Sequence, residues 1–249
     1  MSSGANEELD RRILELGLSA KVLDVGGWAQ PYPLATHVVD LMSYETRREA
    51  IGPYAERFAQ ESWVQADVSE PTFKLPFCDD YFAFALCRHT LEDLHEVRGV
   101  LRECGRVAKR GYVECPSRLM EQTRGVRDRC SFLCGFNHHK WVVDLDPDGL
   151  VFWDKSESFF QPPAHYAVPL WYYERRTQTS ERLVQYYWDE VPRFRIVLDG
   201  NAARQRARDF RAALHVPPAV DWLDRGLLVG RRLRHLASGK SLWPTVVTE

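Results

Sequence analysis

Two glycines and a later aspartate have the spacing of a site that binds a nucleoside. The apolar run at residues 22–25 leads directly into Gly26-Gly27, and this pattern predicts a buried strand that enters a tight turn. A second predicted strand, residues 37–40, ends in Asp40, whose carboxylate could accept two hydrogen bonds from a ribose diol. Because ligands of open α/β sheets bind beyond the carboxyl ends of the strands, these residues indicate a nucleoside-containing cofactor.

The loop after the glycines argues against a dinucleotide. A dinucleotide fingerprint requires G-x-G-x-x-G at the start of a helix, where free N–H groups bind the pyrophosphate. Here residues 28–33 are Trp-Ala-Gln-Pro-Tyr-Pro, with two prolines and no third glycine. The sequence therefore favours a cofactor without phosphate groups.

This segment resembles the first motif of class I S-adenosylmethionine-dependent methyltransferases. Asp24 corresponds to the acidic residue of that motif and Gly26 to its first glycine, whereas Trp28 and Gln30 replace its later glycines. The resemblance is good from residue 21 to residue 117. It rests on Ala66-Asp67, the stretch at 75–82, Arg88 to Leu94, and the stretches 102–111 and 112–117.

Two shorter segments narrow the resemblance. The Gln-Pro-Tyr-Pro at 30–33 and the His139-Lys140-Trp141 triplet are similar to a subset of methyltransferase-11-like proteins that has a G-x-NP-x-P first loop and a later HKW. The resemblance and the alternation of predicted strands and helices both imply an α/β fold, with a mostly parallel twisted sheet and helices on both faces. The sequence after residue 117 adds an appended hairpin and a helical C-terminal region. The resemblance implies S-adenosylmethionine as the cofactor.

The cofactor-binding residues are expected at the carboxyl edge of this sheet. Asp24, Gly26 and Asp40 would hold the methionine and ribose parts, and Asp67 would lie beside the adenine. The full set of candidates is Asp24, Gly26, Gly27, Asp40, Leu41, Asp67, Val68, Arg88 and His89. Arg88 replaces a small residue of the family pattern, which suggests an anionic group on the acceptor.

Two histidines are candidates for the proton acceptor. Methyl transfer to a hydroxyl or amine requires positioning and a base, and histidine has a suitable unperturbed pKa. His89 follows the fourth predicted strand, with Glu92 close behind it; its alternative role is to cap a helix or pack against the cofactor loop. His139 could share one pocket with Trp141, because alternate residues of a strand project to the same face.

The expected function is therefore methyl transfer from S-adenosylmethionine to a small-molecule or carbohydrate-like acceptor. The alternative is a catalytically inactive methyltransferase-like domain that binds partners or serves as a scaffold, and the replacements at Trp28 and Gln30 favour it.

Composition agrees with an ordinary soluble protein. The 249 residues are 45% hydrophobic and 27% charged, and the net charge of −2 gives no pull toward nucleic acid. No apolar run approaches the roughly 18–20 residues that span a bilayer. The N-terminal residues lack the features of a signal peptide, and the six cysteines are scattered, so a reduced, cytoplasmic protein is expected.

The chain is expected to have three parts. Residues 1–117 form the cofactor-binding core, with strands at 21–25, 37–40, 63–66, 83–87 and 111–115. Residues 118–200 form a substrate-facing insertion and closing strands, with a hairpin around Pro147-Asp148-Gly149 and a strand pair around Pro192. The insertion is rich in aromatic residues, which line a ligand site or form a second hydrophobic layer. They include Phe152, Trp153, Phe159, Phe160, Tyr166, Trp171, Tyr172 and Tyr173.

Residues 201–249 form a basic helical arm. Between residues 201 and 240 nine arginines and lysines face three aspartates, with a helix break expected at Pro217-Pro218. This arm is either a docked helix with a solvated charged face or a peripheral contact with an anionic membrane.

A metal is not expected. Cys130, Cys134, His138 and His139 suggest zinc, but adjacent histidines do not have the usual ligand spacing, so packing is the default interpretation.

Overall fold

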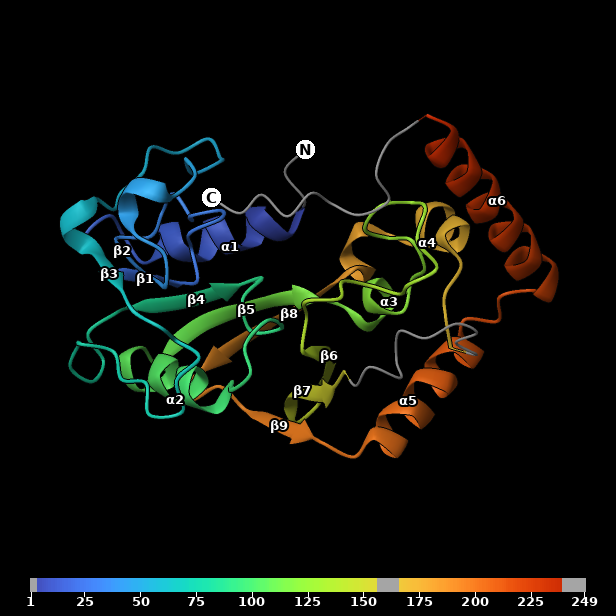
Figure 1. Cartoon of the computed structure of the whole chain (residues 1–249). Helices are drawn as coiled ribbons and strands as arrows, with labels where there is room; N and C mark the ends of the chain where they lie inside the picture. The colour runs from blue at the N-terminus through green and yellow to red at the C-terminus, as the bar shows by residue number, and fades with distance from the viewer. Residues whose placement is uncertain (1–3, 156–165, 239–249) are drawn as a thin grey trace.

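A six-stranded sheet forms the centre of the molecule, and five of its strands are parallel (Figure 1). The structure is a computed structural model that describes residues 4–155 and 166–238. The strand order is β3-β2-β1-β4-β5-β8, with β8 antiparallel to β5. The strands are β1 (Val22–Val25), β2 (His37–Asp40), β3 (Trp63–Gln65), β4 (Phe84–Arg88), β5 (Arg110–Pro116) and β8 (Leu183–Asp189). The five parallel strands lie within a residue or two of their predicted positions.

The strand order reverses beside β1. From β1 the chain builds outward through β2 to β3, and it then returns to place β4 on the other side of β1. In open α/β sheets the connections leave such a point in opposite directions, so a crevice opens at the carboxyl ends of the two strands. The turns after β1 and β4 therefore border the place where a ligand is expected.

Helices cover both faces of this sheet. Helix α1 (Gly4–Glu15) packs Leu9 and Ile13 on one face, and helix α2 (Arg98–Val107) packs Val100, Leu101 and Val107 on the other. The apolar residues of both helices recur at three- and four-residue spacing, which explains why one side of each helix is buried. The mostly parallel sheet with helices on both faces confirms the expected fold class.

A second sheet packs on the face that α2 covers. It contains β6 (Trp141–Asp146), β7 (Gly149–Asp154) and β9 (Phe194–Val197) in the order β6-β7-β9. The β6–β7 hairpin confirms the turn predicted at 147–149. The predicted pairing of the strands around Pro192 is wrong, because β8 pairs with β5 and β9 crosses over to run parallel to β7.

Three of the aromatic residues named for the insertion are buried in the hydrophobic core. Phe152 is fully buried between the two sheets, and Tyr166 and Tyr173 are buried in smaller clusters. These three side chains form a hydrophobic layer and do not line an open site. Phe159 and Phe160 lie outside the described residues.

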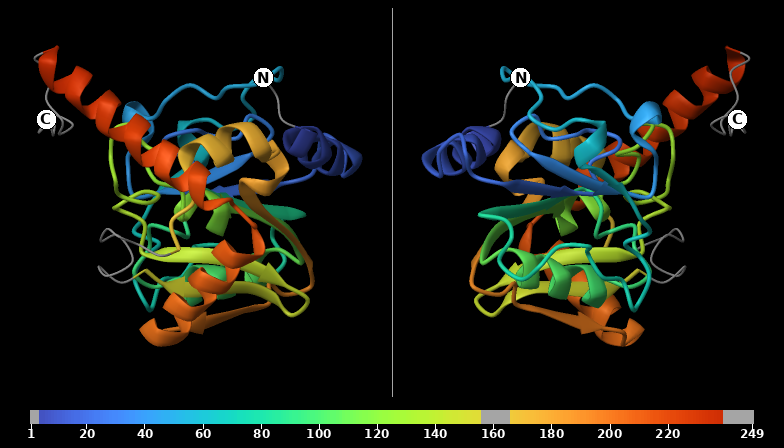
Figure 2. Two further views of the ribbon diagram at one scale, coloured as in Figure 1. Left: turned by 90° about the vertical axis from the view of Figure 1, so that its right-hand side faces the viewer. Right: turned by 90° about the vertical axis from the view of Figure 1, so that its left-hand side faces the viewer.

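The C-terminal helices, α5 (Gly200–Ala213) and α6 (Pro218–Ala237), lie at the opposite end of the molecule from β1 (Figure 1) and face the viewer in the left panel of Figure 2. Asp199 caps α5 by accepting the N–H groups of Asn201 and Ala202. Pro218 occupies the first position of α6, where a backbone N–H would have no hydrogen-bond partner within the helix. The remaining helices are α3 (Arg118–Glu121) and α4 (Leu170–Arg176), with 3₁₀ turns η1 (Tyr44–Thr46), η2 (Gln60–Ser62) and η4 (Thr179–Glu181). Within residues 4–155 and 166–238, every helix is too short or too polar to cross a membrane.

Two glycine-to-alanine changes test the packing of the sheet. A Cβ on Gly111 of β5 would lie 2.1 Å from Trp188 Cζ2 and 2.2 Å from the Ala85 carbonyl oxygen, whereas one on Gly226 of α6 would meet nothing within 4 Å. We expect Gly111→Ala to lower the free energy of unfolding by about 1–3 kcal/mol, because overpacking forces the strands apart. Gly226→Ala should raise it slightly, since alanine favours helix. Equal melting temperatures for the two variants in calorimetry would contradict this packing.

Candidate functional site at the carboxyl edge of the sheet

Four turns follow one another along the carboxyl edge of the parallel strands. Asp67 follows β3, Asp40 ends β2, Gly26 follows β1 and His89 follows β4. The backbone joins neighbouring turns, since Gly26 N–H donates to the Val39 carbonyl and Ala66 N–H donates to the Asp40 carbonyl, both at 2.8 Å. The candidate cofactor residues lie in four separate segments of the sequence, and the fold brings these segments together in one row.

The glycine turn is shaped by its neighbours in the fold. Gly26 has a positive φ of 80°, and a Cβ there would lie 2.0 Å from Thr90 Oγ1. A Cβ on Gly27 would lie 2.6 Å from Asp24 Oδ2 and 2.9 Å from Val38 Cγ1. Both positions therefore require glycine for packing, and Gly26 allows the turns after β1 and β4 to touch.

Asp24 is buried and holds the loop that follows β1. Its side chain is 1% exposed, and its Oδ2 accepts the N–H of Tyr32 at 2.8 Å. Burial raises the pKa of Asp24 to about 6, although Arg88 and the Tyr32 N–H favour the charged form. The Asp24 carboxylate fixes the course of residues 26–32, and its direct contact with the cofactor stays a prediction.

Asp40 is half-buried and faces the same loop. Its Oδ2 accepts the N–H of Trp28 and its Oδ1 accepts the N–H of Met42, each at 2.9 Å. Each carboxylate oxygen has a second lone pair, so both can still accept a hydrogen bond from a ribose hydroxyl. The neighbouring Leu41 is 56% exposed, which leaves an apolar side chain free at this edge.

Asp67 lies in the exposed turn after β3. Its Oδ1 accepts hydrogen bonds from the backbone N–H and the hydroxyl of Ser69, and these bonds lower the pKa of Asp67. Val68 is buried in the core beside it. Val68 therefore packs the turn from below, while the Asp67 carboxylate remains at the surface.

Arg88 binds the loop that follows β1. Its Nη2 donates to the Gln30 carbonyl at 3.0 Å, and its guanidinium lies over the Tyr32 ring, 4.9 Å from the centroid. Its Nε is buried without a hydrogen-bond partner. Arg88 thus holds residues 30–32 over the sheet and retains one donor that no described group accepts.

His89 belongs to a cluster of buried acids. Its backbone is in the left-handed region, with φ of 52°, and its Nε2 lies 3.2 Å from Glu114 Oε1. Its Nδ1 lies 3.6 Å from Oε1 of Glu92, whose other oxygen is buried without a partner. Glu114 also accepts hydrogen bonds from the Tyr112 hydroxyl at 2.5 Å and from Gln185 at 3.0 Å.

These contacts keep His89 charged. Burial opposes the charge, but the hydrogen bonds and charges of Glu114 and Glu92 outweigh it and raise the pKa of His89 to about 9. Burial likewise acts against the Glu114 carboxylate, yet the groups that donate to it lower the pKa of Glu114 to about 2. At neutral pH His89 is an imidazolium, which donates hydrogen bonds and does not accept a proton.

His139 lies in a second cluster, on the other side of the turn at residues 90–93. Its side chain is 7% exposed, and its Nδ1 lies 2.7 Å from Glu121 Oε1. The other oxygen of Glu121 accepts a hydrogen bond from Lys155. Glu121 thereby fixes the orientation of the ring and leaves Nε2 facing Asp93 Oδ1, 3.7 Å away.

The expected position of His139 within a strand is wrong. His139 ends a turn that starts at Phe136, and β6 begins two residues later at Trp141. Trp141 donates its indole N–H to the Leu94 carbonyl and packs against Phe152, so it belongs to the core and not to a pocket shared with His139. The segment is nevertheless near His89, because the Lys140 N–H donates to the Glu92 carbonyl at 2.6 Å.

Asp93, His138 and His139 form the group of possible metal ligands among the described residues. The Asp93 oxygen lies 3.7 and 3.9 Å from the histidine Nε2 atoms. Ligand atoms around tetrahedral zinc lie closer, roughly 3.3 Å apart for metal–nitrogen distances of about 2.0 Å. The spacing is wider than a tetrahedral zinc site requires, so we describe the group as a carboxylate that faces two imidazoles and assign no metal to it. Cys134 is packed in the interior and Cys130 is half-buried, apart from this group.

Two acids of the site were not identified from the sequence. Glu114 lies within the apolar strand 111–115, and a charged residue inside such a run signals a buried partner. Glu121 carries no comparable signal, because its partners His139 and Lys155 are distant in the chain. The Glu121 side chain can occupy its position because residue 135 is glycine. A Cβ on Gly135 would lie 2.4 Å from Glu121 Oε2.

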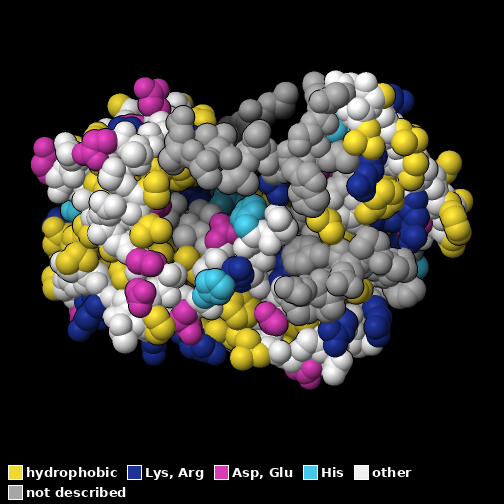
Figure 3. All heavy atoms as spheres, viewed as in Figure 1, with side chains coloured by type: hydrophobic (Ala, Val, Ile, Leu, Met, Phe, Trp, Pro, Cys, Tyr) yellow, Lys and Arg dark blue, Asp and Glu magenta, His cyan; other side chains and the backbone are white. Residues whose placement is uncertain are grey.

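The face drawn in Figure 3 has histidine and acidic side chains close together near its centre. A separate cavity opens at the opposite, amino-terminal end of β4 and β5. It is lined by residues that include Arg12, Phe84, Gly111 and Tyr187. None of the candidate residues borders that cavity, so the two ends of the sheet offer distinct places for a ligand.

Comparison with known proteins gives a family match for the first half of the chain. Residues 23–113 match the profile described as a methyltransferase domain, which is less than half of the chain. The matched segment contains the turns at Gly26, Asp40, Asp67 and His89 and stops before Glu114. No curated protein matches the chain.

Several solved structures are similar to parts of the chain. The YcgJ protein of Bacillus subtilis is 23% identical over 45% of this chain and 51% of its own, with a TM-score of 0.30. S-adenosylmethionine-dependent methyltransferases from Mesorhizobium loti and Aquifex aeolicus are each 19% identical. They match 48% and 45% of this chain, 57% and 64% of their own, with TM-scores of 0.33 and 0.30. The chain thus spans about half the length of the first of these structures.

The charge of His89 can be measured directly. Its folded pKa of about 9 lies above the usual 6.5, so the stability that it contributes is complete below pH 6.5 and is lost as the pH rises through 9. We expect NMR titration to give an apparent pKa near 9 for His89. Glu114→Gln should lower the pKa of His89, because only the Glu92 carboxylate would then offset the cost of burying the charged imidazole. The exposed His95 serves as an internal control. A pKa near 6.5 for His89 in both proteins would contradict the ion pair.

Proposed function

We propose that this protein transfers a methyl group from S-adenosylmethionine to a small-molecule or carbohydrate-like acceptor. The observation that carries the proposal is the order of residues along the carboxyl edge of the sheet. Asp67, Asp40, Gly26 and His89 follow β3, β2, β1 and β4, which are neighbours in this order. The adenine, ribose, methionine and methyl parts of the cofactor have the same order in the arrangement that the resemblance implies.

The chemistry of the edge suits this cofactor. Asp40 can accept hydrogen bonds from the two ribose hydroxyls, and the exposed Leu41 can cover one side of the adenine. The turn after β1 contains two prolines and no helix start, so it offers little to a pyrophosphate. When bound, S-adenosylmethionine supplies an activated methyl group on a sulfonium centre.

The two histidines are proposed to act differently. His89 remains protonated through Glu114 and Glu92, so its proposed role is to donate hydrogen bonds to an acceptor or to a carboxylate of the cofactor. His139 is oriented by Glu121 in the manner of a base held by a neighbouring acid, with Nε2 available for the acceptor's proton. We therefore assign the proton acceptor to His139 and not to His89.

Calorimetric titration with S-adenosylhomocysteine tests cofactor binding. Asp40→Ala should weaken binding by about 1–3 kcal/mol, the value of one or two hydrogen bonds to a charged acceptor. Asp189→Ala is the matched control, because Asp189 also ends a strand but lies beside Arg110 at the opposite edge of the sheet. Thermal melts verify that both variants fold.

Three outcomes of these experiments have distinct meanings. No heat at millimolar S-adenosylhomocysteine would overturn the proposed cofactor. Equal affinity of the two variants would show that Asp40 does not hold the ribose. A separate assay follows the labelled methyl of S-adenosylmethionine. Binding of S-adenosylhomocysteine in the titration, with no transfer of that methyl to any fraction of a small-molecule extract, would favour the catalytically inactive binding domain.

Neighbouring histidines allow a controlled test of the base. His139→Asn should lower methyl transfer by about a hundred- to ten-thousand-fold and leave the affinity for S-adenosylhomocysteine unchanged, as expected for removal of a general base. His138→Asn, at an adjacent and 55% exposed side chain, should retain transfer. Labelled methyl incorporation into the same small-molecule extract measures both. Full transfer by His139→Asn would remove the assignment.

A further inference from the structure

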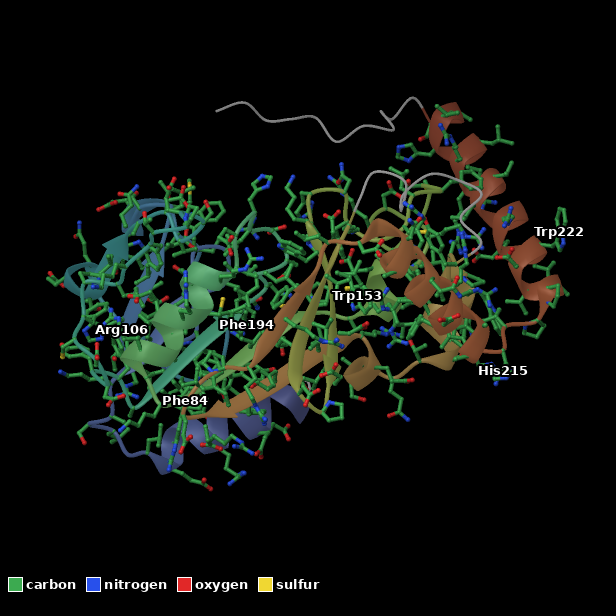
Figure 4. The ribbon with its side chains drawn as sticks, turned by 90° about the horizontal axis from the view of Figure 1, so that it is seen from below. Phe84, Arg106, Trp153, Phe194, His215 and Trp222 are labelled. Carbon is green, nitrogen blue, oxygen red and sulfur yellow. The ribbon has the colours of Figure 1, made fainter. Side chains whose placement is uncertain are left out.

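Helix α6 has an apolar face that the rest of the described chain does not cover. Its six large exposed apolar side chains are Trp222, Leu223, Leu227, Val229, Leu233 and Leu236, which are between 46% and 76% exposed. At 100° per residue these positions, together with Gly226 and Gly230, occupy most of the outward half of the helix. In Figure 4 the Trp222 side chain points away from the body of the molecule.

The inward face of α6 is firmly attached. Leu228 is fully buried, and Asp224, 2% exposed, accepts the N–H of Trp171 from α4 at 3.0 Å. Arg124 binds Asp221 and lies 3.8 Å from an oxygen of Asp224. The helix is therefore docked through its polar and buried side, with its apolar side turned outward, the reverse of an ordinary surface helix.

Arginines border this apolar face on both sides. Arg225 and Arg232 lie along one margin of the face, and Arg231 and Arg234 along the other. The two acidic residues of α6 are Asp221 and Asp224, which both face Arg124 on the inward side, and Asp221 also pairs with Arg225 at 3.0 Å. Arg231, Arg232 and Arg234 are therefore the arginines of the two margins that no acid of α6 pairs with. Figure 3 shows hydrophobic and basic side chains together at this end of the molecule.

We propose that α6 binds the surface of an anionic lipid bilayer, with its axis along the surface. An apolar face with basic margins is the pattern of an interfacial helix, whose apolar side chains enter the boundary between headgroups and acyl chains. Anionic headgroups supply the negative charge that these arginines lack. This placement rests on α6 alone and does not depend on the proposed methyl transfer.

Charge distinguishes this partner from a second copy of the chain. In a two-fold contact the same patch lies on both sides of the interface. Pairing α6 with itself would bring Arg231, Arg232 and Arg234 of both copies together without an acid of the helix to pair with them, and like charges across an interface are unfavourable. A lipid surface buries the same apolar side chains without that repulsion.

Sedimentation with vesicles tests the proposal on the full chain. The wild type should pellet with phosphatidylcholine vesicles that contain phosphatidylserine, and much less with phosphatidylcholine alone or at high salt, where charge is screened. The double variant Trp222→Ser/Leu233→Ser should lower the apparent affinity about tenfold or more, because two apolar side chains no longer enter the bilayer. Leu18→Ser/Ile51→Ser is the matched control, since those side chains are 80% and 77% exposed elsewhere.

Light scattering on the same proteins identifies the competing partner. We expect the wild-type protein to remain monomeric at the concentrations used for sedimentation. Equal pelleting by the two double variants would overturn the proposal. So would a concentration-dependent dimer that the α6 variant abolishes, with no vesicle binding by the wild type.

Discussion

Contact between the turns after β1 and β4 is the constraint on which the rest of the site depends. These strands are neighbours at the reversal of strand order, and Gly26 lies directly against Thr90, with no space for a Cβ between them. That contact brings the loop after β1 next to Arg88, which binds Gln30 and Tyr32. A side chain at Gly26 would separate the two turns and displace the loop that Asp24 and Arg88 fix.

Buried acids organise the chemistry around this contact. Asp24, Glu92, Glu114 and Glu121 are each at most 4% exposed, and each faces a cation or a backbone donor. Glu114 keeps His89 charged, whereas Glu121 is shared between His139 and Lys155 and leaves Nε2 of His139 facing Asp93. Two histidines that look equivalent in the sequence thus have different carboxylate partners.

The sequence predicted the parts of the fold that local pattern determines. The five parallel strands and the 147–149 hairpin follow from short apolar runs and turn residues. The partners of β8 and β9 did not follow, because strand pairing after Pro192 depends on which sheet edge is free, and that is a property of the assembled fold. The contact of Asp24 with the following loop did not follow from the sequence for a similar reason, because it depends on Tyr32, which folds over Asp24. Sequence identified His139 as chemically interesting, but only the structure revealed Glu121 behind it.

The place where the nucleoside binds can be mapped by NMR. In spectra of the labelled protein titrated with S-adenosylhomocysteine, we expect amide shifts at Gly26, Leu41, Asp67 and His89. Residues of the cavity at the other end of the sheet, Arg12 and Tyr187, should remain unchanged. Shifts confined to that cavity, with none at the four turns, would contradict a nucleoside site at the carboxyl edge.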